Sequence, residues 1–123
     1  MIFHITTHKA WQQALKEGVY QADNLETEGF IHCSTADQVI ATANRFYHGQ
    51  PDLVLLVIDP EKLEAELLYE ESEPGEFFPH LYGQLNLDAV TRTIDFPPDH
   101  EGSFSPIERL TSYSILRTPF YPR

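Results

Sequence analysis

The chain has 123 residues and a formal net charge of −11, with 19 acidic residues against 8 basic ones. This length suits one domain around one core, and a hydrophobic fraction of 41% argues against disorder. The scattered bases exclude a nucleic-acid-binding surface and attraction to an acidic membrane, and no apolar run approaches the roughly 20 residues that span a bilayer. A small-molecule or nucleotide ligand suits this charge better.

The cysteine content and the N-terminus indicate the compartment. The single cysteine, Cys33, allows no disulfide within the chain, which favours a reducing environment. The N-terminus has no charged region followed by an apolar stretch, so we expect no signal peptide. We therefore expect a cytoplasmic protein.

The first third of the chain predicts a strand, a helix and a loop. We expect a strand at Met1–Thr6 and a helix at His8–Glu17, because Thr7 can cap the helix and Gly18 can end it. Strand alternation places Ile2, His4 and Thr6 on the face opposite Phe3 and Ile5. The apolar stripe of the helix consists of Trp11, Ala14 and Leu15. The polar segment Gln21–Gly29 predicts an exposed loop.

A second strand, Phe30–Ser34, leads into a second helix with clearer boundaries. Ser34 or Thr35 can cap this helix, and Gln38 follows Thr35 with capping-box spacing. Gly49 ends it. Its apolar stripe, at helical intervals, consists of Ala36, Val39, Ile40, Ala43, Phe46 and Tyr47.

The second half of the chain predicts strands. Leu53–Ile58 is apolar at every position, as in a central strand that is covered on both faces. Further strands are expected at Leu67–Glu71, Phe77–Leu85 and Val90–Phe96, with turns at Glu73–Gly75 and Asn86–Ala89. A tail rich in Pro, Ser and Tyr follows at Asp99–Arg123. Two helices in the N-terminal half followed by strands predict an α+β fold.

The first group of residues that could carry chemistry is Gly29–Thr35. On a strand, His32 and Ser34 share a face, whereas Cys33 faces away and suits the core. Both polar residues precede a helix N-terminus, where unpaired N–H groups favour an anion or a polar ligand atom. The alternative is that Ser34 only caps the helix and His32 only bonds nearby backbone.

The second group is Phe78–Gly83, in which His80 and Tyr82 share a face. Pro79 holds this segment extended, and Gly83 allows close backbone approach or a positive φ. Near neutral pH His80 could act as an acid or a base, and Tyr82 could stack on a ring or donate its hydroxyl. The alternative is a proline-kinked strand with an edge tyrosine.

Other polar residues are weaker candidates. His4 lies on the first strand, where a lone histidine is more often a structural residue. Glu70 and Glu71 end a strand, so one should face inward and the other solvent. His4, His32 and His80 could in principle bind zinc, but they lack local ligand spacing, so we expect no metal.

In this order, these segments resemble a bacterial family known as domain of unknown function 952. The resemblance covers roughly residues 1–108 and assigns residues 1–110 to one domain and 111–123 to a tail. It departs from the family at Gln84, where proline is usual. The matching segments are Ile2–Thr7, Trp11 with Ala14, Glu28–Thr35, Ala43–Tyr47, Leu55–Asp59, Phe78–Gly83 and Leu85–Val90.

The resemblance implies a fold similar to that of ADP-ribosylating enzymes, with a split or mixed β-sheet and a cleft for NAD, and no established reaction. Gly29–Ser34 is similar to a segment of NAD-dependent RNA 2′-phosphotransferases that lines this cleft. By that analogy His4 lies near the ribose, His32 and Ser34 lie at the nicotinamide, and Tyr82 stacks. Thr35 and Gly83 complete the expected cofactor-binding set.

The same resemblance leaves the catalytic glutamate open. Such transferases often stabilise an oxocarbenium-like centre with a late glutamate, whereas here the late segment carries His80 and Glu70 is the substitute. The glycine that follows the first histidine in many relatives is Ile5. The acidic charge also fits poorly with an RNA substrate.

Three hypotheses follow from the sequence. The first is a small enzyme that binds NAD or a related nucleotide, with His32, His80 and Glu70 as catalytic residues. The second is a non-catalytic module that binds a small ligand or a protein in the same cleft. The third is a structural hydrogen-bond network that fixes the crossing of the strands.

Overall fold

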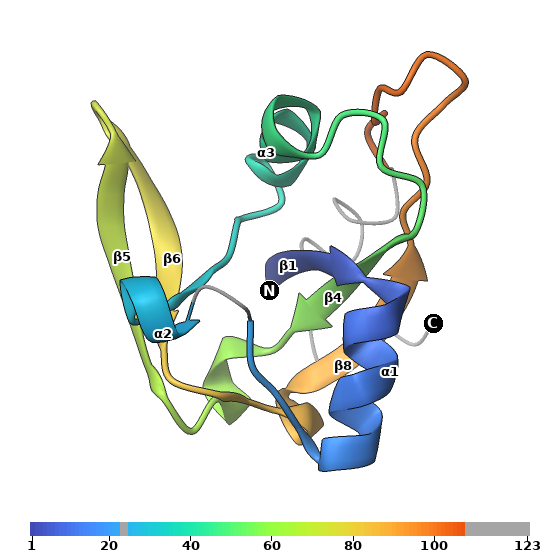
Figure 1. Ribbon diagram of the computed structural model, residues 1–123. Coiled ribbons are helices and arrows are strands. Elements are labelled where there is room, and N and C mark those ends of the chain that lie inside the picture. Colours follow the sequence, from blue (N-terminus) through green and yellow to red (C-terminus); the bar gives the residue numbers. More distant parts are fainter. Residues whose placement is uncertain (23–24, 108–123) are drawn as a thin grey trace, which may run out of the picture.

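A computed structural model of the chain describes residues 1–22 and 25–107, so the predicted boundary at 110 and the tail at 111–123 lie outside the described residues. The described part folds into helices and antiparallel sheets, which confirms the α+β class (Figure 1). The α-helices are α1 (His8–Glu17), α2 (Leu25–Glu28) and α3 (Val39–Phe46). The strands are β1 (Ile2–Thr7), β2 (Val19–Tyr20), β3 (Ile31–His32), β4 (Leu53–Ile58), β5 (Glu66–Glu73), β6 (Glu76–Tyr82), β7 (Leu85–Asn86) and β8 (Val90–Asp95). Short 3₁₀ helices lie at Pro60–Lys62 and Leu87–Ala89.

The central strand β4 is covered on both faces, as its apolar run predicts. It is the middle strand of an antiparallel sheet with the order β1-β4-β8, and all of its residues are buried. Alternate residues pack into two clusters: Val54, Leu56 and Ile58 with Ala14 of α1, and Leu53, Leu55 and Val57 with Val39 and Ala43 of α3. The two helices therefore lie on opposite sides of this sheet (Figure 1).

The predicted alternation of β1 is also confirmed. Phe3 and Ile5 are buried in the cluster that includes α3. Ile2 is buried in the cluster that includes α1, and His4 and Thr6 share its face because they lie two and four residues further along the strand. This face places a histidine inside the protein.

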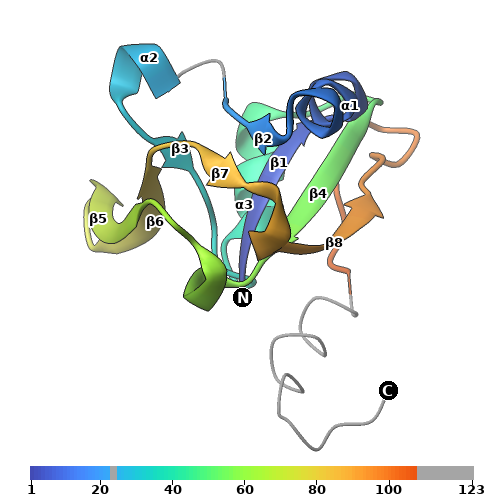
Figure 2. The same cartoon turned by 90° about the horizontal axis from the view of Figure 1, so that it is seen from below.

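The other strands form two further antiparallel sheets, β2-β7 and β3-β6-β5. Figure 2 shows the short β2-β7 pair between the two three-stranded sheets. A bridge between Phe3 and Ser34 ties β1 to the segment that follows β3. The sheet is thus split, as expected, and its described pairs are antiparallel instead of mixed.

The boundaries of α1 follow the local signals, whereas α3 ends at Phe46, before the predicted stop at Gly49. The described residues also contain one α-helix more than expected. Thr7 accepts a hydrogen bond from the Ala10 amide, and Gly18 ends α1 at a φ of 84°. The prediction of a loop over Gln21–Gly29 is wrong for Leu25–Glu28, which form α2. Leu25 packs partly buried against the core, which explains why the mostly polar segment folds.

The second helix uses the expected capping-box spacing, although regular α3 begins only at Val39. Thr35 donates its amide to Gln38 Oε1 over 3.0 Å, and the Val39 amide donates to the Thr35 carbonyl over 3.1 Å. The predicted apolar stripes are too wide, because Leu15 is 51% exposed and Phe46 is 62% exposed. Each helix buries only a narrow face, centred on Ala14 in α1 and on Val39 with Ala43 in α3. No helix in the described residues is long and apolar enough to cross a membrane.

Candidate functional site

The two histidine-bearing segments meet as neighbouring strands. His32 of β3 pairs with His80 of β6 in the antiparallel register, and the centroids of their rings are 5.3 Å apart. Directly opposed residues of antiparallel strands point to the same face of a sheet, so both imidazoles lie on one face of the β3-β6-β5 sheet. The prediction that these two segments come together is confirmed.

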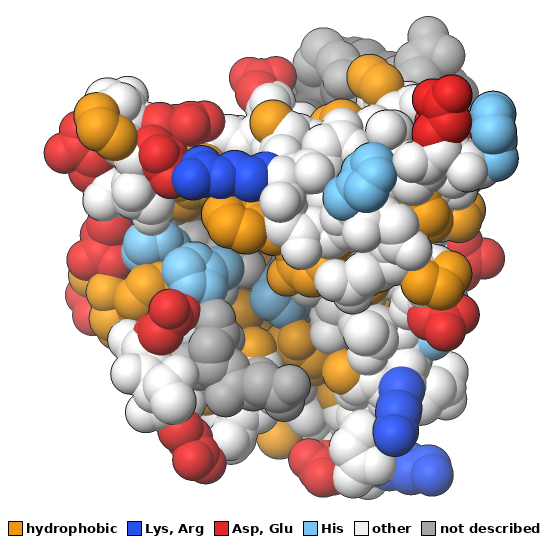
Figure 3. Space-filling view, turned by 45° about the horizontal axis from the view of Figure 1, so that its top comes forward, with side chains coloured by type: hydrophobic (Ala, Val, Ile, Leu, Met, Phe, Trp, Pro, Cys, Tyr) orange, Lys and Arg blue, Asp and Glu red, His pale blue; other side chains and the backbone are white. Residues whose placement is uncertain are grey.

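Aromatic rings surround the two imidazoles. Phe30, which stands just before β3, stacks on His80 with a centroid distance of 4.0 Å and an interplanar angle of 18°. The same phenyl ring lies 4.8 Å from His32 and 5.2 Å from Tyr82. Figure 3 shows histidine side chains gathered in a recess that is lined by hydrophobic side chains. We call Phe30, His32, His80 and Tyr82 the ring cluster.

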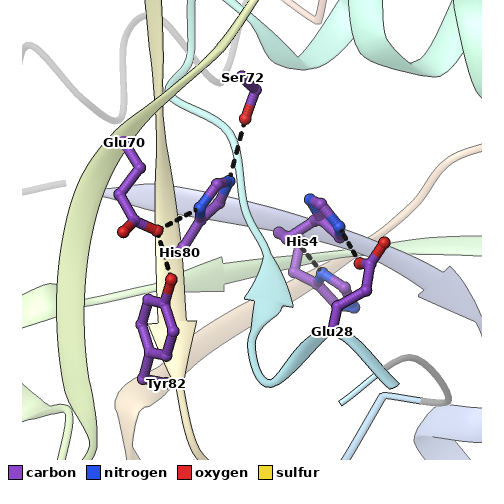
Figure 4. Close-up of polar contacts among 7 residues, drawn as sticks. His4, Glu28, Glu70, Ser72, His80 and Tyr82 are labelled. Atoms are coloured by element: carbon purple, nitrogen blue, oxygen red, sulfur yellow. Dashed lines mark hydrogen bonds and ion pairs between the residues drawn. The ribbon is translucent and has the colours of Figure 1, made fainter. Parts of the chain in front are cut away.

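A carboxylate and a hydroxyl from β5 hold His80 (Figure 4). His80 Nδ1 lies 2.8 Å from Glu70 Oε1, which also accepts a hydrogen bond of 2.6 Å from the Tyr82 hydroxyl. His80 Nε2 lies 3.2 Å from Ser72 Oγ. Glu70 and Ser72 are two residues apart on one strand and reach the same face. Glu70 thus joins the site, although its side chain stays 38% exposed.

The charge on Glu70 sets the direction of these hydrogen bonds. The hydrogen bond from Tyr82, followed by the one from His80, lowers the pKa of Glu70, so its carboxylate is ionised near neutral pH. An ionised carboxylate only accepts, so His80 Nδ1 carries the donated proton. In the neutral ring Nε2 then accepts a hydrogen bond from the Ser72 hydroxyl. This serine–imidazole–carboxylate chain can take up a proton at Nε2 and stabilise the resulting charge.

His32 is the accessible imidazole of the pair. Its Nε2 lies 2.5 Å from Oε1 of Glu28, which stands four residues earlier at the end of α2. The side chains of His32 and Glu28 are 49% and 48% exposed. No hydrogen bond within the described part of the chain engages Nδ1 of His32, so this atom can face a ligand.

His4 lies behind the ring cluster and has a different environment. Its Nδ1 donates to the backbone carbonyl of His32 over 2.6 Å, and its Nε2 lies 2.8 Å from the Tyr20 hydroxyl. That hydroxyl is 2.9 Å from the hydroxyl of Thr6. Burial lowers the pKa of His4 to about 4, so the ring is neutral at pH 7. Both ring nitrogens contact protein atoms, which favours a role in positioning β3 over direct contact with a ribose.

Three other residues expected to bind a cofactor have local structural roles. Ser34 is buried where the chain bridges to Phe3, and no side-chain hydrogen bond within the described residues joins it to the ring cluster. Regular β3 ends at His32, so the alternation that would have placed Ser34 beside His32 does not continue. Thr35 begins the turn that leads into α3. Gly83 has a φ of 152°, and a Cβ there would lie 2.8 Å from the Cβ of Ala65.

Three contact residues were not identified from the sequence, although local signals for them exist. Glu28 stands four residues before His32, and the two side chains meet where the chain turns from α2 into β3. Phe30 stands two residues before His32, the spacing of one strand face. Ser72 follows Glu70 at the same spacing, beside a register shift between Glu71 and Glu73 that redirects side chains.

The other reactive groups restrict the kinds of chemistry that the site can perform. Burial raises the pKa of the Cys33 thiol to about 12, which agrees with the prediction of a small core residue instead of a nucleophile. Within the described ranges, no three His, Cys, Asp or Glu side chains are placed to hold a metal ion. The pKa of Tyr82 is raised by its hydrogen bond to Glu70 and also by the charge of Glu66, so acidic groups surround the ring cluster.

Comparison with known proteins identifies the family. Residues 5–93 match the family model described as "Protein of unknown function (DUF952)". The chain belongs to the DUF952 family. The crystal structure of CC0527 from Caulobacter crescentus resembles this DUF952 protein with 34% sequence identity and a TM-score of 0.82, over 89% of this chain and 97% of that chain. A crystal structure of a CC0527 double mutant gives 33% identity and the same TM-score and coverage.

The solution structure of CC0527 agrees with the crystal structures. It has a TM-score of 0.77 and 34% identity, over 90% of this DUF952 chain and 97% of that chain. The comparison with curated proteins gave no match. The predicted family is thus confirmed, and the function has to be argued from the site.

Proposed function

We propose that this DUF952 protein is a small enzyme of the ADP-ribosyltransferase-like class that binds NAD or a related nucleotide on the β3-β6-β5 face. One observation carries this proposal: the buried His80 is oriented by the carboxylate of Glu70, and the ring of Phe30 is stacked on it. Perturbed titratable groups that converge beside aromatic rings are the usual marks of a ligand site. A reducing cytoplasmic location and the absence of a metal requirement remain part of the proposal.

Each residue has a role in this reading. The carboxylate of Glu70 takes the place of the late glutamate of such transferases and stabilises positive charge that develops at a ribose carbon. The bond from this carbon to nicotinamide breaks, and nicotinamide leaves. His80 accepts, at Nε2, the proton of the water or hydroxyl group that attacks the carbon in its place; the hydroxyl of Ser72 now lies at this nitrogen. The half-exposed imidazole of His32 and the phenol of Tyr82 contact the bases of the ligand.

Binding can be tested directly by calorimetric titration and thermal shift with NAD, ADP-ribose and nicotinamide. We expect saturable binding to the wild-type chain and its loss in H80A and E70Q. The matched control is H8A, because His8 is a surface histidine that lies 3.2 Å from Asp95 outside the ring cluster. Absence of binding to the wild type at millimolar ligand would refute the proposal.

Catalysis is a separate question from binding. Release of nicotinamide from NAD, followed by chromatography, should be lost in H80A and retained in H8A. Turnover that survives H80A would show that His80 is not the catalytic acid or base, whatever the binding result.

The alternative is a non-catalytic module that binds a small ligand or a protein in the same place. The observation that favours it is that both nitrogens of His80 and one oxygen of Glu70 already have partners within the protein. This reading predicts ligand binding that H80A abolishes, without turnover of any tested nucleotide. A purely structural network predicts that H80A lowers stability and that no ligand binds.

A further inference from the structure

We propose that Arg45 binds the phosphates of the ligand and that Glu73 holds this arginine in place while the site is empty. This inference rests on the proposed function, because it assigns the part of the site that would distinguish a nucleotide from a ligand without phosphate, such as nicotinamide. It concerns α3 and the end of β5, which lie beside the ring cluster.

The charge around the ring cluster creates the need for such a residue. Glu28 and Glu70 contact the two histidines, and Glu66 acts electrostatically on Tyr82. A diphosphate brought to these carboxylates would be repelled unless a cation lay nearby. The basic residues of the described part are Lys9, Lys16, Arg45, Lys62 and Arg92. Of these, Arg45 is the one with an ion pair to the β3-β6-β5 sheet.

Contacts from both ends of α3 place Arg45 at the site. Its Nη1 lies 2.8 Å from Glu73 Oε2, and Glu73 directly follows Ser72, whose hydroxyl contacts His80. At the other end of the helix, the Gln38 side-chain amide donates to the Phe77 carbonyl of β6 over 2.8 Å. Figure 3 shows Lys and Arg surface near the histidine side chains of the recess, with hydrophobic surface between them. Helix α3 therefore presents its arginine at the rim.

The present partner of Arg45 is one that a phosphate can displace. The side chains of Arg45 and Glu73 are 58% and 42% exposed, and an ion pair this open to water is weak. A guanidinium binds phosphate through two parallel hydrogen bonds, which gives it an advantage over a single contact. The guanidinium also lies 4.9 Å from the ring centroid of Phe46. The exposed Phe46 thus supports the arginine as a platform.

The test compares two ligands that share the nicotinamide riboside portion, of which only NAD carries the diphosphate, together with an adenosine. NAD and nicotinamide riboside are titrated calorimetrically into the wild type, R45A and E73Q. We expect R45A to weaken NAD binding about tenfold and to leave nicotinamide riboside within about twofold. We expect E73Q to tighten NAD binding about threefold, because the arginine loses its competing partner, with no effect on nicotinamide riboside.

A control variant and the salt dependence sharpen the result. R92A removes an arginine on β8 and should leave both affinities unchanged. Raising the salt concentration should weaken NAD binding to the wild type more than to R45A, because ions screen the arginine–phosphate attraction. Circular dichroism and thermal unfolding establish that each variant is folded.

The opposite outcomes have separate meanings. If R45A weakens both ligands equally, or if E73Q weakens NAD binding, the ion pair is structural and the inference is overturned while the proposed function stands. If NAD does not bind the wild type at all, the proposed function fails and this inference fails with it.

Discussion

His4 and His80 are both buried, yet the groups that contact their rings differ. Their exposed fractions are 7% and 4%. His4 contacts a backbone carbonyl and the hydroxyl of the buried Tyr20. His80 contacts the carboxylate of Glu70, which is 38% exposed, and the hydroxyl of the exposed Ser72. The hydrogen bonds of His4 stay within the core between the sheets. Those of His80 reach the surface through Glu70 and Ser72.

This comparison shows that burial of an imidazole does not by itself identify a functional histidine. Uncharged partners in the interior favour a neutral ring, as the lowered pKa of His4 shows. A carboxylate partner can stabilise positive charge on an imidazole when a proton is transferred. The histidine suited to proton transfer is therefore the one whose partners carry charge and meet solvent.

The largest expected effect is the loss of stability in H4A. This substitution removes the hydrogen bond to the His32 carbonyl and leaves a cavity, so we expect it to cost about 3–4 kcal/mol of unfolding free energy. Urea unfolding measures the difference. The exposed control H8A should cost less than about 0.5 kcal/mol. If H4A lowered the free energy of unfolding by less than about 1 kcal/mol, His4 would not have the structural role that we assign to it.

The second effect is a pH dependence that belongs to His4. Its pKa falls from 6.5 in the unfolded chain to about 4 in the folded protein, so the unfolded state binds the proton first as the pH drops. Stability from this residue is complete above pH 6.5 and decreases toward pH 4 by about 3 kcal/mol. The stability gap between the wild type and H4A should therefore narrow over this range in urea unfolding. A constant gap would contradict the assignment of a neutral buried ring.

The smallest effect concerns the hydrogen bonds around His80, which reach the surface through Glu70. The hydrogen bond to the carboxylate of Glu70 is the main cause of the raised pKa of Tyr82, followed by burial and by the charge of Glu70. E70Q keeps the shape of the side chain but replaces this carboxylate with a neutral amide, which accepts a weaker hydrogen bond. We expect the pKa of Tyr82 to fall toward its ordinary value, as measured by ultraviolet titration of the tyrosinate, with Y82F identifying the signal. Stability should change little, because the side chain of Glu70 meets solvent. An unchanged titration would show that the hydrogen bond between Tyr82 and Glu70 does not persist in solution.

Much of the architecture was predictable because its signals are local. A capping threonine and a terminal glycine define α1, and the uninterrupted apolar run of Leu53–Ile58 identifies the central strand. The shared face of His80 and Tyr82 follows from strand alternation. Predictions failed where packing overrides pattern, as at the exposed Phe46 and in the short helix α2.

The sequence by itself determined the main elements of the fold, the family and the two segments that carry the site, since these depend on patterns within a few residues. Only the tertiary structure decided that Glu70 and Ser72 form hydrogen bonds with His80. It also decided that Ser34 lies outside the ring cluster and that His4 is buried behind this cluster. The reason is physical: strand register and the partners of a buried side chain depend on contacts between residues far apart in the chain, and these form only when the whole core packs.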